Sequence, residues 1–306
     1  MTGRDCAPSV SVIIRLVRAI LIPQITYCFP LLHIDLITLH KITQIISTPL
    51  RKTLGLGSHA SAARTLWECG IPGIDTILLQ HTIAAANRSH RAIGNASLAE
   101  VPPMLAFDIS HFNFHSYKPS RKFTFLPYRF HRFSGKNLFP PLPIGKSDLK
   151  RIINSAAKAE FSSTPKLSAD AISLKADLLP ELYLSHDPKP IVSIRARCRL
   201  GVALTPKQLF KYKKRASPLC ESCHVVGDLK HVLMDCTRFN VARLACAKAL
   251  SWLYVPIPLD LNLILGLAPF LPPRFADEKK FQVLIHEQCL DHTGKFLAAI
   301  SRQQFL

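Results

Sequence analysis

Residues 220–236, CESCHVVGDLKHVLMDC, contain three cysteines and one histidine at the spacing of a four-ligand metal site. The Cys220-x2-Cys223 pair lets one tight turn deliver two sulfurs to the same ion, and His231 and Cys236 come from the start and end of a short helical piece. Three thiolates and one imidazole fill the coordination shell of tetrahedral zinc. We therefore predict a structural Zn²⁺ at these four residues, with no open position for a catalytic water.

Residues near the four ligands are expected to cap and pack the short helical piece, and one of them is a second candidate for the imidazole ligand. We expect Asp228 to cap the start of the piece. His224 also offers an imidazole, but it is adjacent to Cys223 and geometrically awkward for the same ion. The alternative interpretation is a set of unrelated buried thiols with an incidental imidazole, which is how we interpret the remaining six cysteines. The apolar residues expected to pack the piece down are Val232, Leu233, Phe239 and Leu244.

A basic tract precedes the metal segment. From residue 188 to residue 220 there are nine Lys or Arg residues and no Asp or Glu. Its arginines would spread over the surface of a helix or share one face of a strand, and the pattern leaves both open. Thr205 as N-cap and Pro206 at the first position predict a helix over 206–213, whose basic end could equally serve as a nuclear import signal. The predicted phosphate contacts are Arg195, Arg197, Arg199, Lys211, Lys213, Lys214 and Arg215.

The composition indicates a globular and strongly basic chain. Of its 306 residues 48% are hydrophobic, which is enough to build real cores. There are 39 Lys and Arg against 20 Asp and Glu, which gives a formal net charge of +19. A charge of this size predicts a polyanionic partner, RNA and/or DNA, although a basic protein without such a partner is the alternative. We expect no small-molecule substrate.

The cysteines and the N-terminal apolar stretch bear on the location of the protein. Nine cysteines without a regular framework, and without a secretory signal before them, predict an intracellular protein of the nucleus and/or the cytoplasm. Pro23, Pro30 and Asp35 interrupt the apolar stretch before it reaches the roughly 20 residues that a membrane span needs. We therefore expect no membrane association.

The pattern along the chain predicts a mainly α protein in three parts. These are a helical N-terminal region (1–95), a Pro-rich basic and aromatic connector (96–147), and a helical C-terminal region (148–306) that holds the metal segment. The first helix is expected to end at Pro23. Further helices are predicted over 34–54, 62–69, 74–93, 148–161, 169–179, 241–253 and 281–296.

The connector alternates cations with aromatic rings. This pattern suits single-stranded nucleic acid, because charge holds the phosphates while bases stack on rings such as Phe123, Phe125 and Tyr128. The alternative is a linker whose rings pack onto neighbouring regions and whose charges are merely solvated.

Two parts of the sequence resemble one protein family. The knuckle residues Leu219–Cys223 and Asp228–Cys236, followed by Arg238, Phe239 and Arg243, resemble the C-terminal zinc knuckle of non-LTR (LINE-like) retrotransposon reverse transcriptases. The segment from Ile194 to Gly201 resembles the arginine and glycine segment that precedes this knuckle. Residues 21–27 and 49–56 are similar to the helical thumb that follows the polymerase palm. The chain departs from the family at Thr237, where a proline is common, and it contains no fingers or palm segment.

The resemblance implies a nucleic-acid-binding fragment of an RNA-directed DNA polymerase. In that family the C-terminal region holds template RNA and target DNA, while the palm carries the catalytic aspartates. A chain without the palm is expected to be catalytically inactive alone, as a truncated transposable element would be. The alternatives are a zinc-stabilised protein-interaction module that docks an acidic protein on its basic surface, and a pseudogene product without function.

Overall fold

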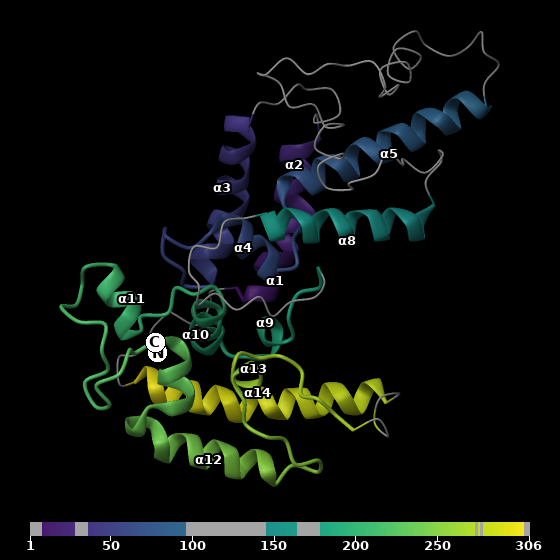
Figure 1. The fold of residues 1–306 in the computed structure, drawn as a ribbon. Coiled ribbons are helices and arrows are strands. Elements are labelled where there is room, and N and C mark those ends of the chain that lie inside the picture. The colour runs from purple at the N-terminus through teal and green to yellow at the C-terminus, as the bar shows by residue number, and fades with distance from the viewer. Residues whose placement is uncertain are drawn as a thin grey trace. The chain divides into compact units, whose positions relative to one another are not determined.

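The described part of the chain is helical. The structure is a computed structural model that describes residues 8–27, 36–95, 145–163, 178–272, 275 and 278–302 (Figure 1). Within these residues the backbone forms helices and no strand, apart from one isolated antiparallel bridge between Leu219 and Val226. The prediction of a mainly α protein is confirmed. None of the described helices is long and apolar enough to cross a membrane.

Two of the sequence predictions lie outside the described residues. The connector between residues 95 and 145 is one, and with it the proposed stacking residues Phe123, Phe125 and Tyr128. The other is most of the helix predicted over 169–179. Both stay predictions.

The chain forms two compact units, each built from segments that are distant in the sequence. The first unit takes Met1–Arg15, Pro49–Gly70 and Lys166–Leu306, and the second takes Leu16–Thr48 and Ile71–Pro165. The predicted divisions near residues 95 and 147 follow chain order, whereas the compact units do not. Residues 49–70 belong with the C-terminal helices, and the helix that follows the connector belongs with N-terminal segments.

The second unit is held together by two long helices that pack on each other. Helix α5 (Ile74–Asn95) contacts α8 (Lys146–Ser163), and their interface has a small apolar core of Leu79, Ile83 and Ala156. The hydroxyl of Thr26 lies 3.0 Å from Nε2 of His81 and so joins the N-terminal helical segment to α5. Helix α3 (Leu36–Thr53) belongs to this unit up to Thr48, and its last residues, from Pro49 on, belong to the first unit.

The first helical segment does not end at Pro23, so this prediction was wrong. The chain continues from α1 (Val10–Leu16) through a π-helical turn, η1 (Val17–Leu21), into α2 (Ile22–Thr26). The N–H of Ile22 bonds to the carbonyl of Val17, five residues back, which is the widened spacing of a π-turn. Pro23 therefore occupies the first turn of a new helical piece, where its missing N–H costs little.

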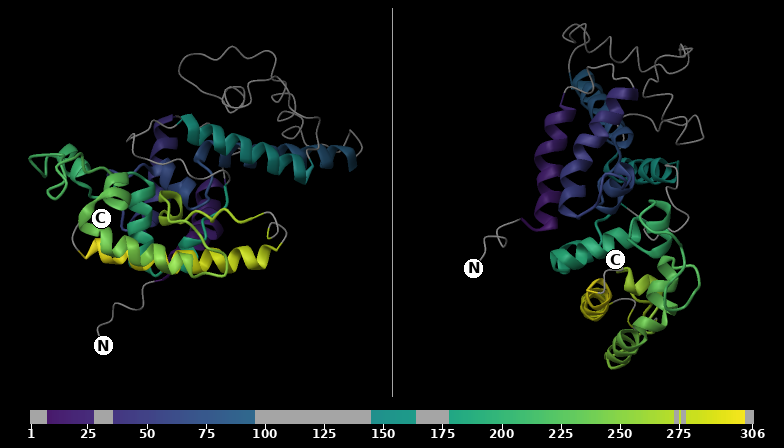
Figure 2. Two further views of the ribbon diagram at one scale, coloured as in Figure 1. Left: turned by 60° about the horizontal axis from the view of Figure 1, so that its bottom comes forward. Right: turned by 90° about the vertical axis from the view of Figure 1, so that its left-hand side faces the viewer.

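The first unit contains the metal segment and the larger core. Helix α14 (Lys279–Ser301) packs alongside α12 (Asn240–Ser251) (Figures 1 and 2). It also contacts three shorter helices, α9 (Tyr183–His186), α10 (Lys189–Arg199) and α13 (Leu261–Ile264). Buried side chains such as Leu233, Leu250 and Ile285 belong to one continuous apolar cluster. The described helices that lie wholly within this unit are α4 (Ala62–Glu68), α9 (Tyr183–His186), α10 (Lys189–Arg199), α11 (Pro206–Lys211), η4 (His231–Asp235), η5 (Thr237–Phe239), α12 (Asn240–Ser251), α13 (Leu261–Ile264) and α14 (Lys279–Ser301).

Helix prediction from periodicity was accurate for the longer elements. The structure confirms a helix at every predicted position that it describes in full, with ends that differ by a few residues. Ser61 caps α4 and Thr205 caps α11, each accepting a hydrogen bond from the backbone N–H three residues later.

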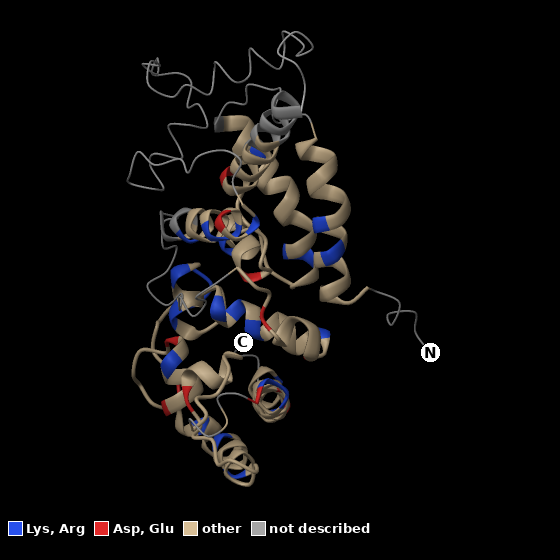
Figure 3. Cartoon of the chain, turned by 90° about the vertical axis from the view of Figure 1, so that its right-hand side faces the viewer, with Lys and Arg blue, Asp and Glu red and all other residues tan. Residues whose placement is uncertain are grey.

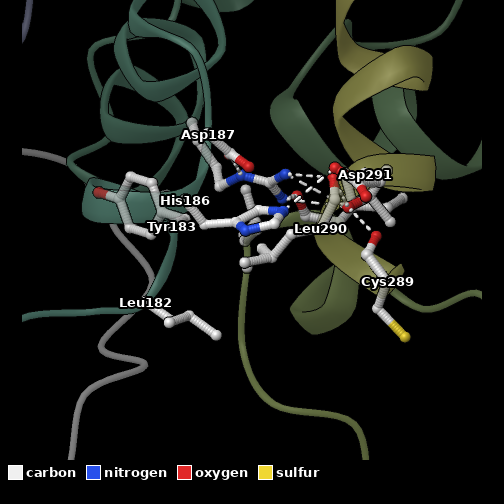
Figure 4. A network of polar contacts seen from close by, with 12 residues as sticks. Leu182, Tyr183, His186, Asp187, Cys289, Leu290 and Asp291 are labelled. Carbon is white, nitrogen blue, oxygen red and sulfur yellow. Dashed lines mark hydrogen bonds and ion pairs between the residues drawn. The ribbon is translucent and has the colours of Figure 1, made fainter. Parts of the chain in front are cut away.

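A buried polar network joins α10 to its neighbours in the first unit. The guanidinium group of Arg195 donates to Asp187 Oδ2 at 2.8 Å and to the carbonyls of Ile264 and Leu290 (Figure 4). Arg199 Nε lies 2.6 Å from Glu68 Oε1, and Tyr183 donates its hydroxyl to the same carboxylate oxygen at 2.7 Å. These contacts tie α10 to α4, α9 and α14, so the helix is anchored along its inner face.

Candidate metal centre and its basic neighbourhood

Four residues lie within metal-binding distance of one another, as predicted. One ligand atom from each of Cys220, Cys223, His231 and Cys236 lies within 4.8 Å of the others. The sulfur of Cys236 is 3.7 Å from that of Cys220 and 3.9 Å from that of Cys223. Tetrahedral zinc with Zn–S bonds of about 2.3 Å requires sulfurs about 3.8 Å apart. The thiols are therefore already spaced for one tetrahedral ion.

The histidine supplies an independent sign of a missing partner. The side chain of His231 is buried, and its Nε2 has no hydrogen-bond partner among the described residues. Leaving a buried polar atom unpaired costs about 1–3 kcal/mol, so such atoms are rare in native proteins. An ion bound between the three sulfurs would give this nitrogen a partner, which is the arrangement expected of a Cys3His site.

Local backbone geometry brings the first two ligands together. Cys220 donates its N–H to the carbonyl of Val225 at 2.7 Å, and His224 donates to the carbonyl of Cys220 at 2.9 Å. His224 has a φ of +56°, the left-handed region that closes the turn, and its side chain is exposed. The cluster uses His231 and not His224, in agreement with the prediction.

The second pair of ligands comes from the two ends of one π-helical turn. Asp228 accepts a hydrogen bond from the N–H of His231 at 2.8 Å, so the predicted cap is confirmed. Cys236 then bonds through its N–H to the carbonyl of His231 at 2.7 Å, which closes the turn. Val232, Leu233 and Phe239 are buried as expected. Leu244 is exposed, so its predicted packing role was wrong, because it lies on the outer face of α12.

Arg243 clamps the ligand-bearing turn, a role that the sequence did not reveal. From α12 its Nε donates to the carbonyl of Leu233 at 3.1 Å, and its terminal nitrogen donates to the carbonyl of Cys236 at 2.8 Å. Both carbonyls lie at the end of the helical turn, where backbone acceptors lack partners of their own. The clamp therefore fixes the backbone of Cys236 from outside the metal segment.

Two of the thiols have pKa values that differ from that of a free cysteine. Burial raises the pKa of Cys236 to about 11. The hydroxyl of Thr237, 3.4 Å from the sulfur of Cys223, lowers the pKa of that half-buried thiol. A bound metal takes thiolates, so binding would release protons and would be favoured by rising pH.

A chain of contacts links the metal segment to the predicted basic helix. The turn after the first two ligands forms the bridge between Leu219 and Val226, and Gly227 then donates to the carbonyl of Pro218 at 2.9 Å. The carbonyl of Gly227 accepts from Lys207 at 3.1 Å. A Cβ at Gly227 would lie 2.6 Å from Cγ of Pro206, so only glycine allows this approach. The start of α11 is thus seated on the metal turn.

The basic end of α11 is exposed and sharply turned. Lys213 and Lys214 donate their N–H groups to the carbonyls of Phe210 and Leu209, both at 2.9 Å, in a Schellman arrangement. Lys213 occupies the left-handed position of this motif with a φ of +56°, where glycine is usual. The turn presents Lys211, Lys213 and Lys214 to solvent.

The two flanking cations of the predicted set are only partly available. Arg215 is half-buried and forms an ion pair with Glu221 at 2.8 Å. Arg197 is half-buried, and its Nε donates to the carbonyl of Gly55 at 3.1 Å. The ring of His59 stacks on that of Tyr212, the C-cap residue of α11, with centroids 5.4 Å apart.

Arg195 and Arg199 are not at the surface, so their predicted phosphate contacts were wrong. Residues 189–199 form a helix, and an i, i+4 pair lies on one face of a helix, here the inner one. The side chains of Arg195 and Arg199 are 0% and 2% exposed and pair with Asp187, Glu68 and Glu181. Burial lowers the pKa of Arg195. Burial also opposes the charge of Arg199, but Glu68 and its neighbours outweigh it and raise that pKa.

The four candidate ligands match in number and type the full coordination shell of one tetrahedral ion. Figure 3 shows Lys and Arg on most of the described helices, with fewer Asp and Glu, as the composition requires. No protein-family model, curated protein or solved structure matches the chain.

Proposed function

We propose that the first unit is a zinc-stabilised module that binds RNA and/or DNA. Cys220, Cys223, His231 and Cys236 hold one structural Zn²⁺, and exposed cations at the end of α11 contact phosphates. The spacing of the sulfurs and the orphaned Nε2 of His231 support the metal. The observation that carries the binding role is the seating of α11 on the metal turn, through Pro206 and Gly227.

In this proposal the metal fixes the positions of the charged side chains at the end of α11. Lysine side chains on a flexible segment lose conformational entropy when they bind, whereas a fixed backbone reduces that cost. The turn at Lys211, Lys213 and Lys214 contains no acidic residue, and Glu221 pairs with Arg215. Such a group neutralises several phosphates at once and releases their counterions.

The resemblance to non-LTR retrotransposon reverse transcriptases supports the same proposal. In that family the knuckle region binds nucleic acid and the palm performs the polymerisation. We accordingly assign binding and no catalysis to this chain. The sequence-tolerant character of phosphate contacts fits a region that holds different nucleic acids.

The test is a salt titration of binding to labelled single-stranded RNA and DNA oligonucleotides, followed by fluorescence anisotropy. Each phosphate contact contributes about 0.7 to the slope of log affinity against log salt for single strands. The double variant Lys211→Ala with Lys214→Ala should reduce the slope by about 1.4. The matched control removes two exposed lysines elsewhere in the same unit, Lys189→Ala with Lys295→Ala, and should leave the slope nearly unchanged.

Removal of the metal provides the second arm of the test. A zinc chelator should weaken binding by the wild type, because the seat of α11 is lost. Absence of binding at low salt would overturn the proposal. Equal salt slopes in the two double variants would also overturn it. They would mean that the net charge of the whole chain drives binding, and not the basic end of α11.

A further inference from the structure

Exposed aromatic and basic side chains form a second surface in the first unit, outside the metal set. Trp252 and Tyr254, in the bend that ends α12, are 77% and 81% exposed. The ammonium group of Lys248 lies 5.0 Å from the centroid of the Trp252 ring. Large aromatic side chains usually bury most of their surface, so two neighbouring exposed rings mark a contact surface.

The rings are held in place although they are exposed. Tyr254 meets Phe281 edge to face, with centroids 5.8 Å apart, and Phe281 stacks on Phe275 at 4.7 Å. Lys248 lies one turn before Trp252 and contacts its ring, which restricts the orientation of the indole. Pre-positioned rings lose little entropy on binding, because Trp and Tyr have only two side-chain torsions.

The exposed rings, with cations beside them, favour a partner that has flat apolar groups. Lys279 and Lys280 are exposed at the start of α14, directly before Phe281, and Lys248 is exposed on α12. Asp277 and Glu278 precede them in the sequence, so the rings and not the net charge distinguish this surface. Single-stranded nucleic acid presents bases that stack on aromatic rings beside phosphates that bind cations.

We propose that Trp252 and Tyr254 form a base-stacking site for single-stranded nucleic acid, with Lys248 binding an adjacent phosphate. The site rests on the proposed function, since it adds base contacts to the phosphate contacts at α11. One face of the indole is near the Lys248 ammonium group, and the large exposed fraction leaves ring surface for a base. The contact is independent of base identity, because every base has a π-face.

The experiment uses the intrinsic fluorescence of the zinc-loaded full chain. Trp67 and Trp252 are its two tryptophans, and Trp67 is only 5% exposed. A ligand that binds at the surface therefore changes mainly the emission of Trp252. The probes are a twelve-nucleotide oligothymidylate and an abasic oligomer with the same number of phosphates. We expect the oligothymidylate to quench Trp252 and the abasic oligomer to leave its emission unchanged.

Substitution measures the size of the contact. Trp252→Ala should weaken oligothymidylate binding by about 5- to 150-fold, the loss of one base–aromatic stack, and should leave abasic-oligomer binding unchanged. The matched control is Val241→Ala, which removes an equally exposed apolar side chain (82%) at the other end of α12. This control should bind both probes as the wild type does.

Each alternative outcome overturns the stacking site. Unchanged oligothymidylate affinity in Trp252→Ala, with a steep salt dependence retained, refutes stacking while the phosphate contacts at α11 stand. Equal losses of oligothymidylate affinity in Trp252→Ala and Val241→Ala would show a general effect of exposed apolar surface and would refute base stacking. Quenching of Trp252 by phosphatidylcholine vesicles and not by oligothymidylate would show a lipid contact. Absence of all binding by the wild type refutes both proposals.

Discussion

Replacement of one metal ligand, Cys223→Ser, should make the stability of the first unit independent of zinc. Cys223 is the most accessible of the three thiols, so the substitution removes a ligand without opening a large cavity. The hydroxyl of serine does not replace a thiolate as a zinc ligand, and three remaining ligands leave the coordination shell incomplete.

The expected magnitude follows from linkage. At free zinc a thousandfold above its dissociation constant, a site present only in the folded state adds about 4 kcal/mol to the free energy of unfolding. In a unit of roughly 150–250 residues each kcal/mol changes the melting temperature by about 2–4 °C, so zinc should raise that of the wild type by about 8–16 °C. The Cys223→Ser variant should show no such increment.

The assay is thermal unfolding with and without zinc, combined with the zinc content of the purified protein. Cys246→Ser is the matched control, because Cys246 is buried outside the metal set and a serine can still donate to the carbonyl of His292, 3.6 Å away. This control should lower the melting temperature with and without zinc and keep the zinc-dependent increment. One bound zinc and an unchanged increment in Cys223→Ser would refute the assignment of the site.

Two further predictions separate stability from binding in the first unit. Lys213→Gly should raise the free energy of unfolding by about 0.5–1 kcal/mol, because it relieves a left-handed backbone, and should lower the salt slope of binding by about 0.7. The control Lys214→Gly should lower the slope without the gain in stability, and equal stabilities of these two variants would contradict the reasoning. Arg199→Met should cost about 3–5 kcal/mol in chemical denaturation, because it removes the cation that neutralises the buried carboxylate of Glu68. The neighbouring Arg197→Met should cost less than about 1 kcal/mol, and similar costs for both would mean that the buried pair is not what holds α10.

The metal set could be predicted from the sequence because its geometry is local. Two ligands come from one turn and two from one helical turn, so spacing alone specifies the arrangement. Asp228 and Thr205 were recognisable as caps for the same reason, since a cap acts on the backbone three residues away. These features depend on few contacts beyond their own segment.

The burial of Arg195 and Arg199 could not be predicted, because their carboxylate and carbonyl partners include residues that are distant in the sequence. Glu68 lies 131 positions before Arg199, and nothing in the basic tract indicates which carboxylates will meet it. A weaker local signal was present. Arg195 and Arg199 share one helical face with apolar residues such as Ile191, Ile194 and Cys198, all of which are buried. Arg197 lies off that face and is the arginine of the three that remains partly exposed.

The metal segment and the core of the first unit stabilise each other. The free energies of apolar burial and of the unpaired His231 nitrogen decide whether the unit stays folded after zinc is removed. Val232, Leu233 and Phe239 belong to the same apolar cluster as Leu250 and Ile285. Burial of three such side chains contributes about 5–9 kcal/mol, whereas the orphaned His231 nitrogen costs about 1–3 kcal/mol without metal. The core therefore retains the segment when zinc leaves, and the unit is destabilised but stays folded at low temperature. Loss of binding should then precede loss of fold, because Cys220 and Cys223 lie in the turn on which α11 is seated, so this turn loses its metal while the apolar cluster remains.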